Sequence, residues 1–341
     1  MAPPDAPSPP PSSPPPPDRA PAVLAGPLLV VPGVALVAVS LAGSAGDLHW
    51  LCDLCSHFRG HYLVAAALLI ALAAWCHARP ALGLATVALA WNAWVVLPFL
   101  PLPSAMPGAA VPRDARPVRL VSLNVHLHND DITAVLDYLR NRQADVVALV
   151  EVDEAWAPAL ADLGDRYPHQ FIRPRNDPFG VAILSAWPLV APRAAHCGDA
   201  PWPALVAEID RGGGRFTMVV VHPHPPLDAV TDRQLTAHLR CVARLVATTA
   251  GPCVVAGDFN ATPWSAPYRH FVHDSGLVDS ALGRGIQPTW HAGLWPLRIP
   301  IDHIFVPQGT LVTGRRVGPD VGSDHFPIEA EFNLPRAVGP R

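Results

Sequence analysis

The chain has 341 residues, which is enough for one large domain with additional segments. It carries 24 basic residues, all of them arginine, against 28 acidic residues, so its formal net charge at pH 7 is −4. Nucleic-acid binders usually show a basic surplus, because arginine and lysine make the phosphate contacts. The acidic balance therefore disfavours a general nucleic-acid binder, although a local basic groove would not appear in this total.

Charge is unevenly distributed along the first third of the chain. The stretches 20–46 and 80–112 contain no formally charged residue, and a third apolar run covers 62–76. Apolar runs of about 18 residues or more are typical of transmembrane helices. The alternative is a buried hairpin of a soluble domain, but three such runs rarely fit one soluble core. We therefore expect three transmembrane helices, over residues 22–43, 61–77 and 81–102.

Composition divides the chain into five segments. The first 20 residues are mostly Pro, Ala and Ser, which form no packed core, and they lack the basic start of a cleavable signal peptide. The expected segments are a Pro-rich tail over 1–20, a membrane anchor over 21–103, a linker over 104–115, a folded domain over 116–335 and a short tail over 336–341.

The folded domain alternates short β-rich runs with amphipathic helices. Helices are expected over 132–139 and 235–245 from the spacing of their apolar residues, with Asp130 or Asp131 as the N-cap of the first. This alternation predicts an α/β domain. Strands are expected at 118–125, 145–150, 181–184, 204–209, 216–221, 253–256, 301–306 and 328–332.

Polar residues follow these strands where a sheet would deliver side chains to a common crevice. Each alone has an ordinary explanation, as a turn residue, a helix cap or a solvated histidine. Together they match what phosphoester hydrolysis requires, namely carboxylates for a hard cation, a group to position water and cationic donors for phosphate oxygens. The residues are Asn124, Glu151, His222, Asp258, Asn260, Asp302, Asp324 and His325.

The order of these residues, with Gly-Asp-Phe-Asn at 257–260 and Ser-Asp-His at 323–325, resembles the endonuclease/exonuclease/phosphatase superfamily, which is DNase I-like. The resemblance covers essentially all of the folded domain. With the N-terminal spans, the chain is similar to a membrane-anchored bacterial branch that includes teicoplanin-resistance proteins. The resemblance implies a four-layer α/β sandwich, with two mixed sheets packed face to face and helices outside, which depends on Mg²⁺ or alternatively Mn²⁺.

The resemblance also implies where the metal binds. Glu151 would be the main ligand, with Asn124 and Asp324 in the same environment. Many nuclease members place an acid two residues after the first asparagine, whereas this chain has His126 there. A second acid on the metal side is therefore missing, which puts a two-metal arrangement in doubt.

The remaining residues take catalytic roles by the same resemblance. Asp258 would orient or deprotonate the attacking water, and Asn260 would hold Asp258 or a phosphate oxygen. His325 would contact the scissile phosphate, polarised by Asp302, and His222 would contact the phosphate from the other side or assist the leaving group.

Several histidines and cysteines keep alternative interpretations. His126, His128 and His224 are either further phosphate contacts or solvated loop residues. Cys52 and Cys55 could form a disulfide in an oxidising space, or a metal site with a nearby histidine. Sequence does not decide the pairing of the three later cysteines, which are Cys197, Cys241 and Cys253.

These features predict a membrane-anchored phosphodiesterase or phosphatase that acts on a lipid-linked or other envelope phosphoester. The alternatives are an envelope nuclease acting on DNA or RNA, and a non-catalytic resistance or ligand-binding module. Three spans place the two ends of the chain on opposite sides of the membrane. The arginine count favours a cytoplasmic catalytic domain, while the family resemblance favours an extracytoplasmic one, which we expect. Oligomeric state is left open.

Overall fold

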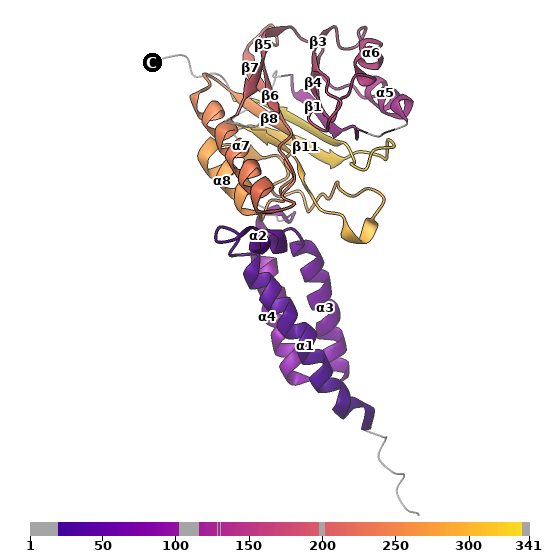
Figure 1. The fold of residues 1–341 in the computed structure, drawn as a ribbon, viewed down its shortest axis with the longest axis vertical. Helices are drawn as coiled ribbons and strands as arrows, with labels where there is room; N and C mark the ends of the chain where they lie inside the picture. Colours follow the sequence, from indigo (N-terminus) through magenta and orange to yellow (C-terminus); the bar gives the residue numbers. More distant parts are fainter. Residues whose placement is uncertain (1–19, 102–115, 128, 130, 198–201, 336–341) are drawn as a thin grey trace, which may run out of the picture.

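The molecule consists of a narrow bundle of apolar helices with a layered α/β domain packed on one end of it (Figure 1). The computed structural model describes residues 20–101, 116–127, 129, 131–197 and 202–335. The predicted linker, the predicted C-terminal tail and all but the last residue of the predicted N-terminal tail lie outside the described residues.

Two six-stranded sheets form the centre of the α/β domain. Both are mixed, because β1 pairs with β2 in parallel and β7 pairs with β8 in parallel, while the other described pairs are antiparallel. The first sheet has the order β11 (Leu311–Val317), β12 (Ile328–Asn333), β1 (Val118–Asn124), β2 (Val146–Val150), β4 (Val181–Ser185), β3 (His169–Arg173). The second has the order β5 (Leu189–His196), β6 (Pro203–Asp210), β7 (Arg215–Val221), β8 (Cys253–Asp258), β10 (Asp302–Val306), β9 (Val278–Asp279).

The two sheets pack face to face around an apolar core. Leu120 and Val146 of the first sheet and Leu205 and Met218 of the second are buried in the same cluster. Helices cover the outer faces, so the central strands are buried on both sides and read as continuous apolar runs. The predicted two-sheet sandwich is confirmed. The helices are α5 (Ile132–Asn141) and α6 (Trp156–Ala161) on the first sheet, and α7 (Ala229–Thr248) and α8 (Ala266–Ser275) on the second.

The eight predicted strands and both predicted helices are present, with ends shifted by a few residues. Asp131 caps α5, since its side chain accepts a hydrogen bond from the backbone N–H of Ala134 at 3.0 Å, whereas Asp130 lies outside the described residues. Sequence reasoning missed β3, β5, β9, β11, α6 and α8. Most of these strands lie at sheet edges and are partly exposed, so they lack a continuous apolar run.

Three long helices coincide with the three predicted spans, joined by one short helix. One of them, α4 with its 3₁₀ extension (Arg79–Phe99), is long and apolar enough to cross a membrane. Helices α2 and α3 are long and apolar enough to cross a membrane only if they are counted as one span, and the two helices are bent by 63° relative to each other. Three transmembrane helices are therefore not shown. The helices are α1 (Ala20–Ala42), α2 (Trp50–Ser56), α3 (Arg59–Trp75), α4 (Arg79–Val96) and η1 (Leu97–Phe99).

The helical bundle has an inside-out arrangement of side chains. Its interior is lined largely by alanine, including Ala66, Ala73, Ala81, Ala85 and Ala88. Large apolar side chains point outward instead, which is the reverse of a soluble domain. They include Leu28, Val31, Val64, Leu68, Trp75, Val87 and Trp94.

The bundle is held against the α/β domain through α2 and the loop before it. The Asp53 carboxylate accepts a hydrogen bond from the backbone N–H of Ala266, at the start of α8, at 2.6 Å. Asp47 forms an ion pair with Arg269 at 2.9 Å and lies 2.8 Å from His270 Nε2. These contacts join polar groups of the helical region to one helix of the sandwich.

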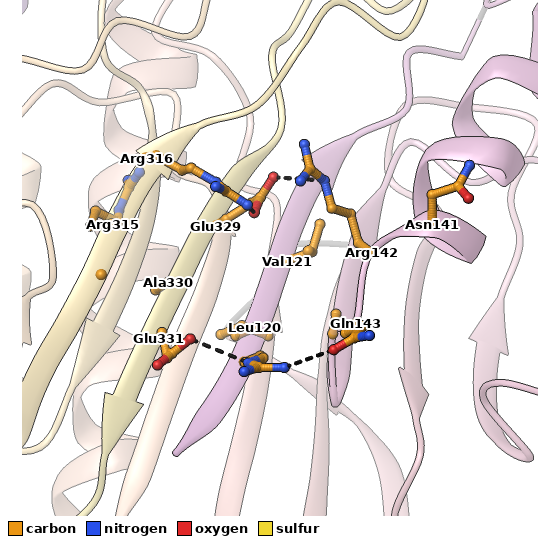
Figure 2. Close-up of a pocket in the computed structure, with 13 residues that line it drawn as sticks. Leu120, Val121, Asn141, Arg142, Gln143, Arg315, Arg316, Glu329, Ala330 and Glu331 are labelled. Atoms are coloured by element: carbon orange, nitrogen blue, oxygen red, sulfur yellow. Dashed lines mark hydrogen bonds and ion pairs between the residues drawn. The ribbon is translucent and has the colours of Figure 1, made fainter.

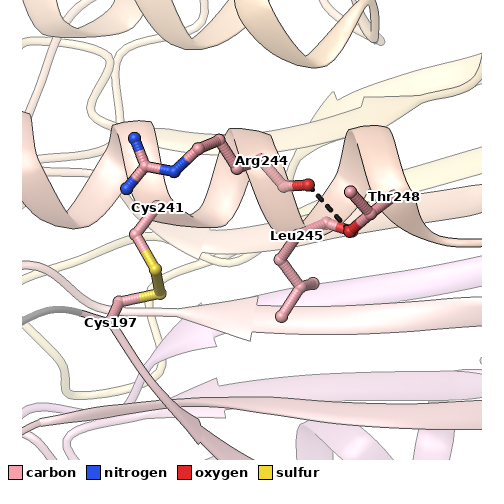
Figure 3. Close-up of a disulfide and its surroundings, with 5 residues drawn as sticks. All are labelled: Cys197, Cys241, Arg244, Leu245 and Thr248. Atoms are coloured by element: carbon pink, nitrogen blue, oxygen red, sulfur yellow. Dashed lines mark hydrogen bonds between the residues drawn. A yellow bond between two sulfur atoms is a disulfide. The ribbon is translucent and has the colours of Figure 1, made fainter.

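A disulfide links the end of β5 to the middle of α7 (Figure 3). It joins Cys197 and Cys241, whose Cα atoms are 5.4 Å apart and which are separated by 44 positions in sequence. Cys253 is free and buried, while Cys52 and Cys55 are free and partly exposed. Tertiary structure thus decides the pairing that sequence left open.

Removing this disulfide should destabilise the domain. A loop of this length restricts the unfolded chain, so the double variant Cys197→Ser, Cys241→Ser should lose about 4 kcal/mol of unfolding free energy. Denaturant unfolding followed by tryptophan fluorescence measures the loss, with Cys76→Ser as a control. Equal stability of the double variant and the wild type would contradict the linkage.

One buried histidine should make the fold sensitive to acid. His238 of α7 is 0% exposed, and neither ring nitrogen makes a hydrogen bond within the described residues. Burial, helped by the charge of His222, lowers the pKa of His238 to about 4. The unfolded chain therefore binds this proton first, and stability falls as pH drops from about 6.5 towards 4.

We predict that His238→Leu removes part of this acid sensitivity. Between pH 7 and pH 5 the wild type should lose about 2 kcal/mol more stability than the variant. Denaturant unfolding at both pH values gives the difference, with the exposed His273→Leu as the matched control. If wild type and His238→Leu lose the same amount, His238 is not the acid-sensitive group.

Candidate active site

The predicted site residues are brought to one edge of the sandwich by the two parallel strand pairs. Asn124 ends β1 and Glu151 directly follows β2 in the first sheet. His222 directly follows β7 and Asp258 ends β8 in the second. Because each pair runs in parallel, its carboxyl ends lie together, and face-to-face packing brings the two sets into contact.

A turn near the C-terminus closes the site. The Ser323 hydroxyl donates a hydrogen bond to the backbone carbonyl of Asn124 at 2.7 Å and accepts one from the backbone N–H of His325 at 3.0 Å. The register of β10 against β8 places Asp302 directly opposite Asp258. These contacts bring His325 between the two carboxylates.

Asp258 is the central group and is only 2% exposed. Its Oδ2 accepts a hydrogen bond from the Asn124 amide at 3.2 Å, and it lies 3.5 Å from His222 Nε2 and 3.6 Å from His325 Nε2. Burial would raise the pKa of Asp258, but the His325 charge and the His222 hydrogen bond outweigh it and hold the pKa at about 2. A buried carboxylate among several donors is placed to hold and orient a water molecule.

His325 is an imidazolium held by two acids. Its Nδ1 donates to Asp302 Oδ2 at 2.8 Å, and the Thr289 hydroxyl donates to the same oxygen at 2.5 Å. Burial opposes the charge, yet Asp302 and Asp258 together raise the pKa of His325 to about 10. At neutral pH this side chain is therefore a positive hydrogen-bond donor, which suits contact with an anionic phosphate.

His222 faces the same centre from the second sheet. Its Nδ1 donates to the backbone carbonyl of Pro178 at 2.8 Å, which directs Nε2 towards Asp258. Burial lowers the pKa of His222, but the hydrogen bond to Asp258 and the charges of Asp258 and Glu151 produce a net rise. His222 and His325 thus direct two imidazole nitrogens towards one carboxylate.

Glu151 and Asp324 form the acidic side of the site. Glu151 Oε1 accepts from the Asn124 amide at 2.7 Å, and Oε2 accepts from the backbone N–H of Leu127 at 2.9 Å. Asp324 Oδ1 lies 3.1 Å from His126 Nδ1. Glu151 and His126 both have positive φ angles, 62° and 63°, a costly conformation that the surrounding structure must maintain.

The residues present fit a divalent cation. Glu151 and Asp324 offer carboxylate oxygens at the cavity wall, and hard cations such as Mg²⁺ prefer oxygen ligands. The Asn124 side-chain oxygen accepts from the backbone N–H of His126 at 2.9 Å, so its amide group faces the acids and positions Glu151. Asp258, Asp302 and His325 also converge, with ligand atoms within 4.8 Å of one another. Both ring nitrogens of His325 face carboxylates, however, so we regard His325 there as a donor.

These residues line a cavity of about 580 Å³. Its polar end contains Glu151, His222, Asp258, Asn260, Asp324 and His325, so six of the eight predicted residues reach the cavity wall. Asn260 is tied to this end, since its backbone N–H donates to Asp258 Oδ1 at 2.8 Å. Asn124 and Asp302 lie behind it, in contact with Asp258 and His325 respectively.

A second groove, of about 540 Å³, crosses β1, β11 and β12 away from this site (Figure 2). Its charges are largely paired, with Arg142 3.2 Å from Glu329 and Arg119 3.2 Å from Glu331. It contains none of the predicted site residues. The catalytic chemistry therefore belongs to the first cavity.

Two residues outside the predicted catalytic and metal set support the site. Thr289 supports Asp302, and the Trp290 indole donates to Asp324 at 3.1 Å. Thr289 lies in a loop with no motif, so sequence reasoning missed it. Of the uncertain histidines, His126 lies beside Asp324 and His224 lines the cavity, while His128 lies outside the described residues.

A model of the family described as "Endonuclease/Exonuclease/phosphatase family" matches residues 121–325, which is more than half of the chain. The chain belongs to the endonuclease/exonuclease/phosphatase family. Within its matched residues, the cluster of Asp258, Asp302 and His325 is intact.

Curated relatives of this family member are distant. A UPF0294 protein of Vibrio parahaemolyticus is 27% identical over 159 residues, which cover 45% of this chain and 54% of that protein. A UPF0294 protein of Vibrio campbellii is 25% identical over 163 residues, with the same coverage. The chain thus spans about half the length of the curated relatives it matches. These relatives give no support to the predicted teicoplanin-resistance branch, which stays a prediction.

Solved structures show the same fold. Humanized TDP2 of D. rerio has a TM-score of 0.54 at 17% identity and covers 64% of this chain and 99% of its own. A family protein from Beutenbergia cavernae has a TM-score of 0.55 at 20% identity, covering 66% and 74%. The human Nocturnin catalytic domain has a TM-score of 0.52 at 21% identity, covering 65% and 96%.

We predict that His325→Gln lowers kcat for phosphoester hydrolysis by roughly 10²–10³-fold. The variant keeps a hydrogen-bonding side chain but loses the positive charge, and single donors of this kind are worth about 3–4 kcal/mol of barrier. Steady-state kinetics with bis(p-nitrophenyl) phosphate measure the effect, with the exposed His273→Gln as control. A near-wild-type kcat for His325→Gln would remove His325 from the mechanism.

Proposed function

We propose that this chain is a membrane-anchored phosphodiesterase or phosphatase that hydrolyses a lipid or other envelope phosphoester. The observation that carries the proposal is the position of the inside-out helical bundle, which docks beside the catalytic cavity and contributes Leu54 and Phe58 to its lining. An active site tethered in this way samples phosphoesters at the membrane surface.

The bundle supports a membrane anchor through its surface. Helices that contact lipid need small residues between them and large apolar residues outside, as the alanine-lined interior here provides. Trp75 lies at the end of α3 that is farther from the catalytic domain. Trp91 and Trp94 lie near the C-terminal end of α4, which is the end closer to the catalytic domain. Exposed tryptophans at both ends are typical of the two interfaces of a bilayer.

The disulfide supports an extracytoplasmic catalytic domain. Disulfides persist in oxidising compartments and are rare in the cytosol, so the bond between Cys197 and Cys241 favours the outer side of the membrane. The positive-inside rule counts arginines in the loops beside the spans, and that count favours a cytoplasmic catalytic domain. Arg59 is buried inside the bundle and does not lie in such a loop, so it no longer adds to this count. It donates to the backbone carbonyl of Ser40 at 2.6 Å and to the Asn92 side chain at 3.0 Å.

The proposed mechanism assigns one task to each group. Asp258 orients the attacking water, because it is ionised and buried among donors. His325 and His222 stabilise the negative charge that develops on the phosphoryl oxygens. Asp302 positions His325.

On the acidic side, Glu151 and Asp324 would hold Mg²⁺ or Mn²⁺, and Asn124 would position Glu151. The bound cation supplies further charge stabilisation to a phosphate oxygen. The backbone N–H of Asn260 donates a hydrogen bond to Asp258, and its side-chain amide donates one to the backbone carbonyl of Pro223 at 3.0 Å.

A substrate panel tests the proposal on the purified full-length protein in detergent. The panel contains phosphatidylcholine, sphingomyelin, a polyprenyl phosphate, p-nitrophenyl phosphate and DNA, each with Mg²⁺, Mn²⁺ or EDTA. DNA is included because a structural relative, D. rerio TDP2, is recorded with a single-strand DNA product.

We expect metal-dependent hydrolysis of at least one lipid phosphoester and a loss of roughly 10²-fold or more in Asp258→Asn, because the water-orienting charge is removed. Preferential cleavage of DNA over every lipid would contradict the lipid assignment. Absence of hydrolysis with every substrate, or activity retained in Asp258→Asn, would contradict the proposed function.

A further inference from the structure

The corner between α2 and α3 forms part of the catalytic cavity. Leu54 of α2, with His57 and Phe58 of the turn that follows, lines the same cavity as Asp258 and His325. The catalytic domain therefore does not enclose its own site, and a segment from the membrane side completes it. This contact is formed by residues that no family motif includes.

The cavity is divided by polarity. Its catalytic end is charged, whereas the rest of its wall is mostly apolar and comes from several segments of the chain. A phosphate with only small polar substituents would leave this wall in contact with water, whereas an alkyl chain would cover it. The apolar residues are Leu54, Phe58, Pro178, Phe179, Pro225, Pro226, Leu227, Trp290, Ile299 and Ile301.

One polar group in this wall has no protein partner. His57 is buried, and neither ring nitrogen makes a hydrogen bond within the described residues; Asp53 Oδ2 is 4.0 Å away from Nε2, beyond hydrogen-bond reach. Both ring nitrogens have almost no accessible surface, so His57 offers the cavity no open polar side-chain atom. This part of the wall therefore does not compete with an alkyl chain for hydrogen bonds.

Exposed apolar side chains lie on two segments that contribute to the cavity lining. Leu227 lies at the rim, just before α7. Trp290 and Ile299, which line the cavity, pair across the stem of a loop whose tip carries Trp295 and Leu297, with Trp295 77% exposed. In Figure 1 this orange loop projects from the α/β domain down to the level of α2, where the bundle begins. The rim thus offers apolar contacts on the side that faces the proposed membrane.

We propose that the substrate is a phosphodiester that carries a long alkyl chain, and that Leu54 and Phe58 determine specificity by contacting this chain next to the phosphate. This inference rests on the proposed function and narrows its substrate class. The chain would pass from the bilayer over the loop at 290–299, along the apolar wall and past His57, and the phosphate would meet Asp258 and His325.

Two probes with one leaving group test the inference on the full-length protein in mixed micelles. They are hexadecyl p-nitrophenyl phosphate and methyl p-nitrophenyl phosphate, and both release p-nitrophenolate. The measured quantity is the ratio of kcat/KM for the hexadecyl probe to that for the methyl probe. Enrichment of the long-chain probe in the micelle raises this ratio for every variant alike, so the change in ratio between variants carries the result.

We expect Leu54→Ala and Phe58→Ala each to lower the ratio by roughly tenfold, since each removes apolar contact with the alkyl chain. The conservative variant Phe58→Leu should keep most of the preference. Leu51→Ala is the matched control, because Leu51 lies on the same helix but is 52% exposed and does not line the cavity. Circular dichroism and thermal unfolding verify that each variant is folded.

An unchanged ratio in folded Leu54→Ala and Phe58→Ala would overturn the inference, as would an equal fall in Leu51→Ala. Failure of the proposed function looks different, because the wild type would then hydrolyse neither probe nor any phosphoester of the substrate panel. Hydrolysis of both probes with no effect of the wall variants would leave the enzyme in place and remove only the alkyl-chain specificity.

Discussion

The site depends on keeping one buried carboxylate ionised. Asp258 is almost fully removed from water, and an isolated charge in that position would be prohibitively costly. Four donors offset this cost: the Asn124 amide from the first sheet, His222 and the backbone N–H of Asn260 from the second, and His325 from the turn after β11. These donors come together only when the two sheets pack against each other, so the site forms only when the sandwich is complete.

The same principle governs the other charged groups. Asp302 is opposite Asp258 in the sheet register and would repel it, but His325 lies between them and pairs with both. In the bundle, the buried Arg59 is accommodated by oxygens of neighbouring helices, including that of Asn92. Each buried charge thus specifies which segments must come together, beyond what apolar packing would select.

The helical region and the catalytic domain act as one structure at the site. The bundle presents large apolar side chains outward and contacts α8 through Asp53 and Asp47. This docking completes the apolar wall of the cavity with Leu54 and Phe58. The proposed anchor would therefore do more than concentrate the enzyme at a surface, because it would also shape what the active site accepts.

Sequence by itself predicted an α/β domain, its eight central strands and eight polar residues that the fold brings together, whereas the two-sheet sandwich was implied by the family resemblance. Central strands that are buried on both faces are continuously apolar, and each polar residue near a strand end interrupts such a run. Both patterns are local, so they can be recognised from the sequence. Tertiary structure alone decided the edge strands such as β3 and β5, the pairing of Cys197 with Cys241, and the contributions of Thr289, Trp290 and Leu54. These features arise from contacts between segments distant in sequence, and no local pattern encodes which distant segments will meet.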